Sequence, residues 1–132
     1  HAAMLSERLR WLDDFTQSRR RVAQAYWDGI AHAQVQTMVR PASPLSHVHH
    51  LFVLTTSRRD ELQAHLTAKG VQSHIHYPVP VHHQEPCQQI ARDPAGLPVA
   101  ESHAQRCLSI PCHPFLSDAD VKTVIDAVNS FA

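Results

Sequence analysis

The chain of 132 residues is long enough for one domain with a hydrophobic core, and its 43% hydrophobic and 18% charged residues indicate a globular protein. Lys+Arg and Asp+Glu both number 12, so a formal net charge of zero gives no electrostatic reason to expect nucleic acid or an anionic membrane as a partner. No apolar stretch approaches the length of a membrane span and no signal-like pattern stands at the start, so the cytoplasm is the expected compartment.

One long amphipathic helix is predicted from the first residues to about Ala31. Its apolar residues recur at spacings of three, four or compatible multiples, which suits a single helix face: Leu5, Leu9, Leu12, Val22, Tyr26 and Ile30. The basic run 18–21 lies in this helix beside Asp13 and Asp14, and we expect a solvated helix face there, with anion binding as the alternative. Position 1 is not Met and already reads as helix, so the chain is expected to be part of something larger.

A loop with two prolines at 40–44 separates this helix from a predicted strand at 49–55. The strand is apolar nearly throughout, so both of its faces should be covered. Ser57 is predicted to cap the next helix together with Asp60, and Lys69-Gly70 to end it.

The second half of the chain alternates short elements. They are predicted as strand 71–77, helix 86–91, turn 93–96, helix 98–106, strand 107–110 and a last helix whose buried face holds Val121, Val124, Ile125 and Val128. Ser117 and Asp120 have the spacing of a capping box for that last helix. The order predicts a single α/β domain, a two-layer sandwich of the α+β type with a long N-terminal helix and a small sheet of about three strands.

The segment SHIHYPVPVHHQ at 73–84 is the richest in chemistry. As a metal site it offers two histidines on one strand face and two that could return across a turn: His74, His76, His82 and His83. Two prolines keep the intervening chain extended, and no acidic residue lies inside the cluster. We therefore expect no metal ligand set there, because real ligand motifs are spaced more tightly.

No complete catalytic set is visible either. His76 and Tyr77 could transfer protons, whereas Cys112 beside His113 is more typical of a structural cysteine, because loop neighbours rarely form a nucleophile–base pair. Three glycines leave little from which to build a phosphate loop, and three cysteines without CxxC spacing favour free thiols in a reducing compartment. For His76 and Tyr77 the simpler alternative is packing at a strand end.

Five blocks in chain order are similar to one known family. They lie at 5–13 with 19–26, 50–54 with 58–62, 70–71 with 75–84, 97–101, and 108–114. The most specific is IHYPVPVHHQ at 75–84. Together they resemble the C-terminal part of the DegT/DnrJ/EryC1/StrS family, which are PLP-dependent sugar aminotransferases of the aspartate-aminotransferase-like fold (fold type I).

The resemblance implies that residues 1–132 are the small C-terminal domain and that the large PLP-binding domain is absent. Lys69 and Lys122 do not match the Schiff-base position, so this chain is expected to contain no catalytic residue, to bind no PLP and no metal, and to be inactive alone. The full-length enzyme would bind PLP, form a homodimer, and transfer an amino group from glutamate to a nucleotide-linked keto sugar.

The resemblance also implies that the segment 75–84 forms one wall of the sugar site. The implied substrate-binding residues are His76, Tyr77, His82 and Gln84. The form HYPxPxHxQ is more similar to members acting on 3-keto-6-deoxyhexose nucleotides, in polysaccharide, lipopolysaccharide and O-antigen or in deoxysugar biosynthesis. His83 stands where the family often has an apolar residue, so whether His82 or His83 faces the cleft is open.

Two other functions are compatible with this sequence. One is a non-catalytic regulatory or sensor paralogue on the same fold, since fold does not fix function. The other is a histidine-rich metal-binding module. A Schiff-base lysine in the upstream sequence would favour the enzyme over the sensor, and elemental analysis would test for metal.

Overall fold

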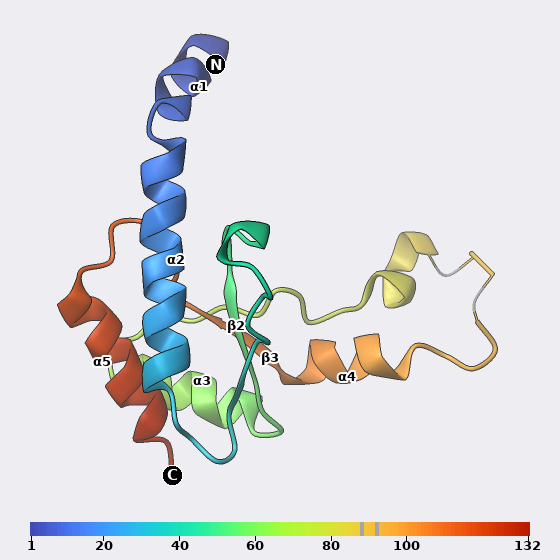
Figure 1. Ribbon diagram of the computed structural model, residues 1–132. Helices are drawn as coiled ribbons and strands as arrows, with labels where there is room; N and C mark the ends of the chain where they lie inside the picture. Colours follow the sequence, from blue (N-terminus) through green and yellow to red (C-terminus); the bar gives the residue numbers. More distant parts are fainter. Residues whose placement is uncertain (88, 92) are drawn as a thin grey trace.

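An antiparallel sheet of three strands lies at the centre of the protein, as seen in a computed structural model that describes residues 1–87, 89–91 and 93–132 (Figure 1). The middle strand is β2 (Phe52–Thr55), flanked by β1 (Gln36–Thr37) and β3 (Cys107–Ile110). β1 was not predicted, since two residues are too short to show an alternating pattern.

One face of the sheet carries the hydrophobic core. The register pairs Phe52 with Ile110 and Leu54 with Leu108, so these buried side chains point to the same side. Helices cover that side: α2 (Leu12–Gly29), α3 (Arg59–Ala68) and α5 (Asp118–Asn129). The predicted two-layer α/β arrangement is confirmed, although Val53 on the opposite face of β2 is only partly covered.

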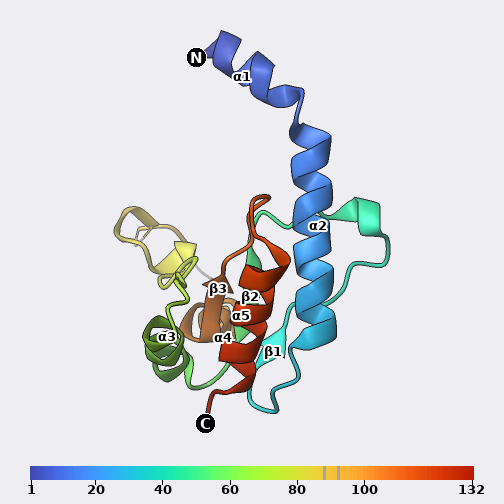
Figure 2. The same cartoon turned by 90° about the vertical axis from the view of Figure 1, so that its left-hand side faces the viewer.

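The N-terminal helix is two helices and not one. α1 (Ala2–Leu9) and α2 are separated at residues 10–11, and α1 projects away from the sheet (Figure 2). Leu5 and Leu9 are more than 60% exposed, whereas Val22 and Tyr26 are completely buried. The shared periodicity was therefore misleading, because within the described part of the chain only the second half of the predicted helix meets the core.

The basic run on α2 is not a solvated face. Arg19 donates to the carbonyls of His49, His50 and Cys112, and Arg20 donates to that of His47 at 3.1 Å. Arg21 donates to the Leu116 carbonyl and pairs with Asp118, while Arg20 also reaches the Leu45 carbonyl. The prediction was wrong for Arg19 and Arg20, which are half-buried because loops distant in sequence supply the acceptors, while Arg21 remains exposed. Through these hydrogen bonds the arginines hold the loops at residues 45–50 and 112–118 against α2.

Two boundaries in the middle of the chain also differ from prediction. α3 begins at Arg59 without a side-chain cap, and Ser57 with Asp60 forms no capping box; instead Arg58 pairs with Glu61 at 2.6 Å and reaches the Ala132 carbonyl. The predicted strand 71–77 is reduced to one bridge between His74 and Ser109. Pro78 and Pro80, without amide donors, end the pairing directly afterwards.

Short 3₁₀ turns occupy the loops: η1 (Pro44–Ser46), η2 (Val81–His83) and η3 (Glu85–Cys87). The last overlaps the start of the predicted helix 86–91, of which position 88 lies outside the described residues. The turn at 93–96 is confirmed by a 3.0 Å bond from the Gly96 amide to the Asp93 carbonyl. Among the described residues, no helix has the length and apolar content needed to cross a bilayer.

The later elements agree with prediction residue by residue. α4 (Pro98–Arg106) starts with its proline in the first turn and leads directly into β3. Ser117 caps α5, and its Oγ accepts from the Asp120 amide at 3.2 Å while the Asp120 carboxylate accepts from the Ser117 amide at 2.9 Å. Lys69 ends α3, and Gly70 follows with φ of 77°, a conformation that glycine adopts without strain.

Replacing Ser117 by alanine should lower the free energy of unfolding by about 1 kcal/mol, because one side of the capping box is lost. The hydrogen bonds from Ser117 hold the pKa of Asp120 below its ordinary value of 3.8. The folded-state pKa is depressed, so this contribution is present at neutral pH and is lost as the pH falls below that value. Urea unfolding of S117A at pH 7 and pH 3 measures both effects. T123A, on the exposed side of the same helix, is the control and should change little.

Candidate functional site

A hollow of about 730 Å³ lies between the segment 77–97 and helix α4. Figure 1 shows residues 77–87, in yellow, extending together with α4, in orange, away from the rest of the protein. Apolar side chains dominate its wall, among them Val79, Val81, Ile90 and Leu97. Binding sites for small organic molecules commonly have this form, an apolar concavity with a few convergent polar groups.

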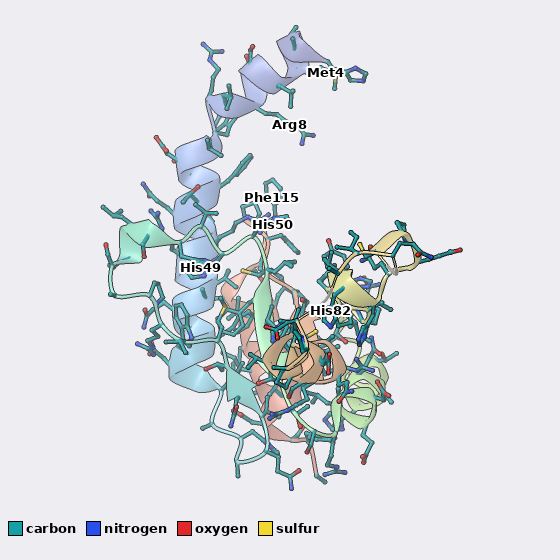
Figure 3. The ribbon with its side chains drawn as sticks, turned by 90° about the vertical axis from the view of Figure 1, so that its right-hand side faces the viewer. Met4, Arg8, His49, His50, His82 and Phe115 are labelled. Atoms are coloured by element: carbon teal, nitrogen blue, oxygen red, sulfur yellow. The ribbon has the colours of Figure 1, made fainter. Side chains whose placement is uncertain are left out.

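The two prolines and the η2 turn determine how histidines enter this hollow. Pro80 holds the extended backbone with φ of −59° and ψ of 150°, and its carbonyl accepts from the His83 amide at 2.9 Å. The resulting turn directs His82 toward α4 (Figure 3). A stiff approach of this kind loses little conformational entropy when a ligand is bound.

Both histidines of the η2 turn lie against the carboxylate of Glu101. His82 Nε2 lies 3.1 Å from Glu101 Oε1, and His83 Nε2 lies 3.6 Å from the same oxygen. The hydrogen bond from His82, with help from the charges of His83 and His82 and a backbone bond from Leu97, holds the pKa of Glu101 below its ordinary value. An ionised carboxylate only accepts, so the hydrogen of the 3.1 Å bond sits on His82 Nε2.

The structure brings three of the four predicted substrate-binding residues to this hollow. Tyr77, His82 and Gln84 all line it; Tyr77 is 70% exposed and Gln84 is exposed. His76 instead lines a neighbouring hollow of about 320 Å³, where its Nδ1 lies 3.0 Å from Ser109 Oγ. The four therefore occupy two adjacent sites and do not converge on one point.

Basic and imidazole side chains gather around the smaller hollow. Its wall includes Arg19, His50, His74, His76 and His113. The side chain of His50 is exposed, and the neighbouring His49 is buried. Burial, with the charges of His47 and Arg20, lowers the pKa of His49, so at neutral pH it is an uncharged core residue against Trp27.

Sequence reasoning missed Glu101. It lies 19 residues from His82 and on a different element, so no local spacing could connect them. Its place in the first turn of α4 is explained locally by the helix dipole, which favours an acidic residue there. The helix dipole already accounted for an acidic residue at this position, so nothing in the sequence suggested its contact with His82.

PLP does not fit the residues of this chain. A PLP enzyme needs a lysine that can form the Schiff base, and the two lysines present are Lys69 and Lys122. Lys69 is exposed at the end of α3, and Lys122 pairs with Asp126 at 2.7 Å on the surface of α5. Neither lysine lines the hollow.

Comparison with known proteins gives a consistent picture. The sequence pattern of the DegT/DnrJ/EryC1/StrS aminotransferase family matches residues 1–129. The chain is 40% identical over 131 residues to a dTDP-3-amino-3,4,6-trideoxy-alpha-D-glucose transaminase from Streptomyces venezuelae, covering 99% of this chain and 35% of the relative. It is 39% identical over 131 residues to the erythromycin biosynthesis sensory transduction protein EryC1 from Saccharopolyspora erythraea, covering 99% of this chain and 36% of that protein.

Solved structures agree with the sequence match. The fold superimposes on a crystal structure of S. venezuelae DesV in complex with a ketimine intermediate with a TM-score of 0.87 and 40% identity, covering 97% of this chain and 34% of that one. The chain spans about a third of the length of the curated relatives it matches. The family match over nearly all of its residues leads to one conclusion: the chain belongs to the DegT/DnrJ/EryC1/StrS aminotransferase family.

Proposed function

We propose that residues 1–132 act as the small C-terminal domain of a longer nucleotide-sugar aminotransferase and form one wall of its sugar site. The single observation that carries this is the hollow beside α4, where Tyr77, His82 and Gln84 present polar groups above apolar side chains. Family membership supports an aminotransferase, and the share of the relatives that the chain covers supports a separate, larger domain for the cofactor.

In this proposal the chain binds and orients the sugar. PLP, held by the larger domain, supplies the electron sink for amino transfer. His82 is oriented by Glu101, and its ring is suited to contact sugar hydroxyls or the diphosphate, as are the Tyr77 hydroxyl and the Gln84 amide. Val79 and Leu97 offer apolar surface to the unsubstituted carbons of a deoxysugar.

The proposed substrates are glutamate and a 3-keto-6-deoxyhexose nucleotide. The HYPxPxHxQ form of residues 76–84 supports the 3-keto position, and so does the 3-amino sugar in the name of the S. venezuelae relative. The product would serve polysaccharide or lipopolysaccharide synthesis, including O-antigen, or deoxysugar synthesis. We infer that the full enzyme is a cytoplasmic homodimer, with a nucleotide sugar and not nucleic acid or a membrane as its partner.

The test replaces wall residues in the longer polypeptide and measures kinetics with glutamate and a panel of 3-keto and 4-keto sugar nucleotides. His82→Ala should lower kcat/KM for the sugar by about 10- to 100-fold, the loss expected for a hydrogen bond to a charged group, and Tyr77→Phe by about 3- to 10-fold. Most of the loss should appear in KM. Gln105→Ala, on the exposed side of α4, is the matched control and should leave both constants unchanged.

Two results would reject the proposal in different ways. If H82A and Y77F keep the sugar KM and kcat of the parent, the hollow is not the sugar wall. If the parent itself binds a sugar nucleotide but transfers no amino group, the sensor alternative is favoured, as the name of the EryC1 relative suggests for that protein.

A further inference from the structure

The ring nitrogens of His82 and His83 and the carboxylate of Glu101 form a ligand set that aminotransfer does not require. The three ligand atoms all lie within 4.8 Å of one another. Two of the separations, 3.1 and 3.6 Å, bracket the edge of about 3.3 Å of a tetrahedron whose corners are about 2.0 Å from a central ion. The two separations from Glu101 therefore already match those around a small tetrahedral cation, and the third lies within 4.8 Å.

The chemistry of the set selects a class of metal. Two imidazoles and one carboxylate suit a borderline divalent transition metal such as Zn²⁺, whereas Ca²⁺ and Mg²⁺ prefer oxygen ligands. Both histidines approach through Nε2, and an ion would take the place of the hydrogen that His82 Nε2 donates to Glu101, which would move to Nδ1. The ionised Glu101 would offset part of the charge of the ion.

With three protein ligands a tetrahedral ion would keep one open coordination position, and all three ligand residues lie on the wall of the hollow. Three protein ligands with one open position is the arrangement of catalytic and exchangeable zinc sites, and not of closed structural ones. Glu101 comes from α4 and the histidines from η2, so an ion would link these two elements, as the hydrogen bond from His82 already does.

We propose that His82, His83 and Glu101 form a binding site for a zinc-class divalent cation at the wall of the hollow. The site depends on His83, which stands where the family often has an apolar residue. It reverses the expectation from the sequence that the cluster lacks a carboxylate, because α4 supplies Glu101. It stands independently of the proposed function; where both hold, the cation and the sugar would compete for His82.

The test is calorimetric titration of the metal-stripped 132-residue chain with ZnCl₂, with Co²⁺ absorption as a second readout of tetrahedral ligation. We expect one site that saturates before the weak binding of the other histidines. H83L and E101Q each remove one ligand and should weaken that site at least about tenfold. H113N removes an exposed histidine outside the site and should change the dissociation constant less than about twofold. Circular dichroism checks that each variant is folded.

Two outcomes would overturn the proposal. One is that H83L or E101Q, folded like the parent, binds Zn²⁺ with unchanged affinity. The other is that H113N weakens binding as much as H83L, since this would assign the signal to scattered surface histidines. If H83L is unfolded, E101Q decides alone, because it is nearly isosteric and lies in an exposed first turn of α4.

Discussion

The 132-residue chain, incubated with PLP, glutamate and a keto-sugar nucleotide, should form amino sugar no faster than free PLP does. A PLP enzyme accelerates its reaction by about 10⁶-fold or more through a positioned lysine and a cofactor held in a fixed orientation. Lys69 and Lys122 are both on the surface, and Lys122 is already paired with Asp126. Mass spectrometry of the sugar nucleotide after a long incubation measures the rate.

The control for this experiment is a variant without either lysine, K69A/K122A, which should give the same rate as the unmodified chain. A rate above that of free PLP would contradict the prediction only if it falls in this variant, because contaminating aminotransferase would be insensitive to the substitutions. The longer polypeptide, assayed in parallel, should show the full acceleration. This pair of results would place the chemistry in the larger domain and leave binding to residues 1–132.

The elements that could be predicted to the residue are those with strong local signals. α4 begins with Pro98 and α5 with a capping box at Ser117, and in both cases the boundary is encoded within four residues. β3 lies directly between α4 and Pro111, which cannot continue a strand's pairing. Signals of this kind need no knowledge of the rest of the fold.

What could not be predicted depends on contacts far apart in the chain. The arginines of α2 donate to carbonyls up to 95 residues away in the chain. Their charge pattern alone cannot show such distant acceptors, and it therefore suggested a solvent-exposed helix face. Of the strand expected at 71–77, one bridge forms, between His74 and Ser109 of β3. How far the two segments pair depends on where the fold brings them together. For the site, the motif at 75–84 predicted Tyr77, His82 and Gln84, which line one hollow, whereas Glu101, at the end of the 97–101 block, was given no role.

Replacing Phe52 by alanine should destabilise the protein by about 3–5 kcal/mol, the cost of removing a large buried aromatic side chain and leaving a cavity. Phe52 is completely buried on the middle strand, and its ring packs edge-on against Tyr26 at 5.1 Å and Trp27 at 5.4 Å. It therefore joins the sheet to α2. A domain stable by about 5–15 kcal/mol would lose a large fraction of its stability.

Urea unfolding measures this loss as a lower midpoint with an unchanged slope, and thermal unfolding as a fall in Tm of about 10–20 °C. Phe115→Ala is the matched control: the same side chain is removed, but Phe115 is 77% exposed, with Phe15 at 5.5 Å and His113 at 6.5 Å as ring neighbours, so the change should stay below about 1 kcal/mol. Equal effects of the two substitutions would mean that the core does not centre on β2. A large effect of F52A alone would establish that residues 1–132 fold around this contact without a further domain, which the metal titration also requires.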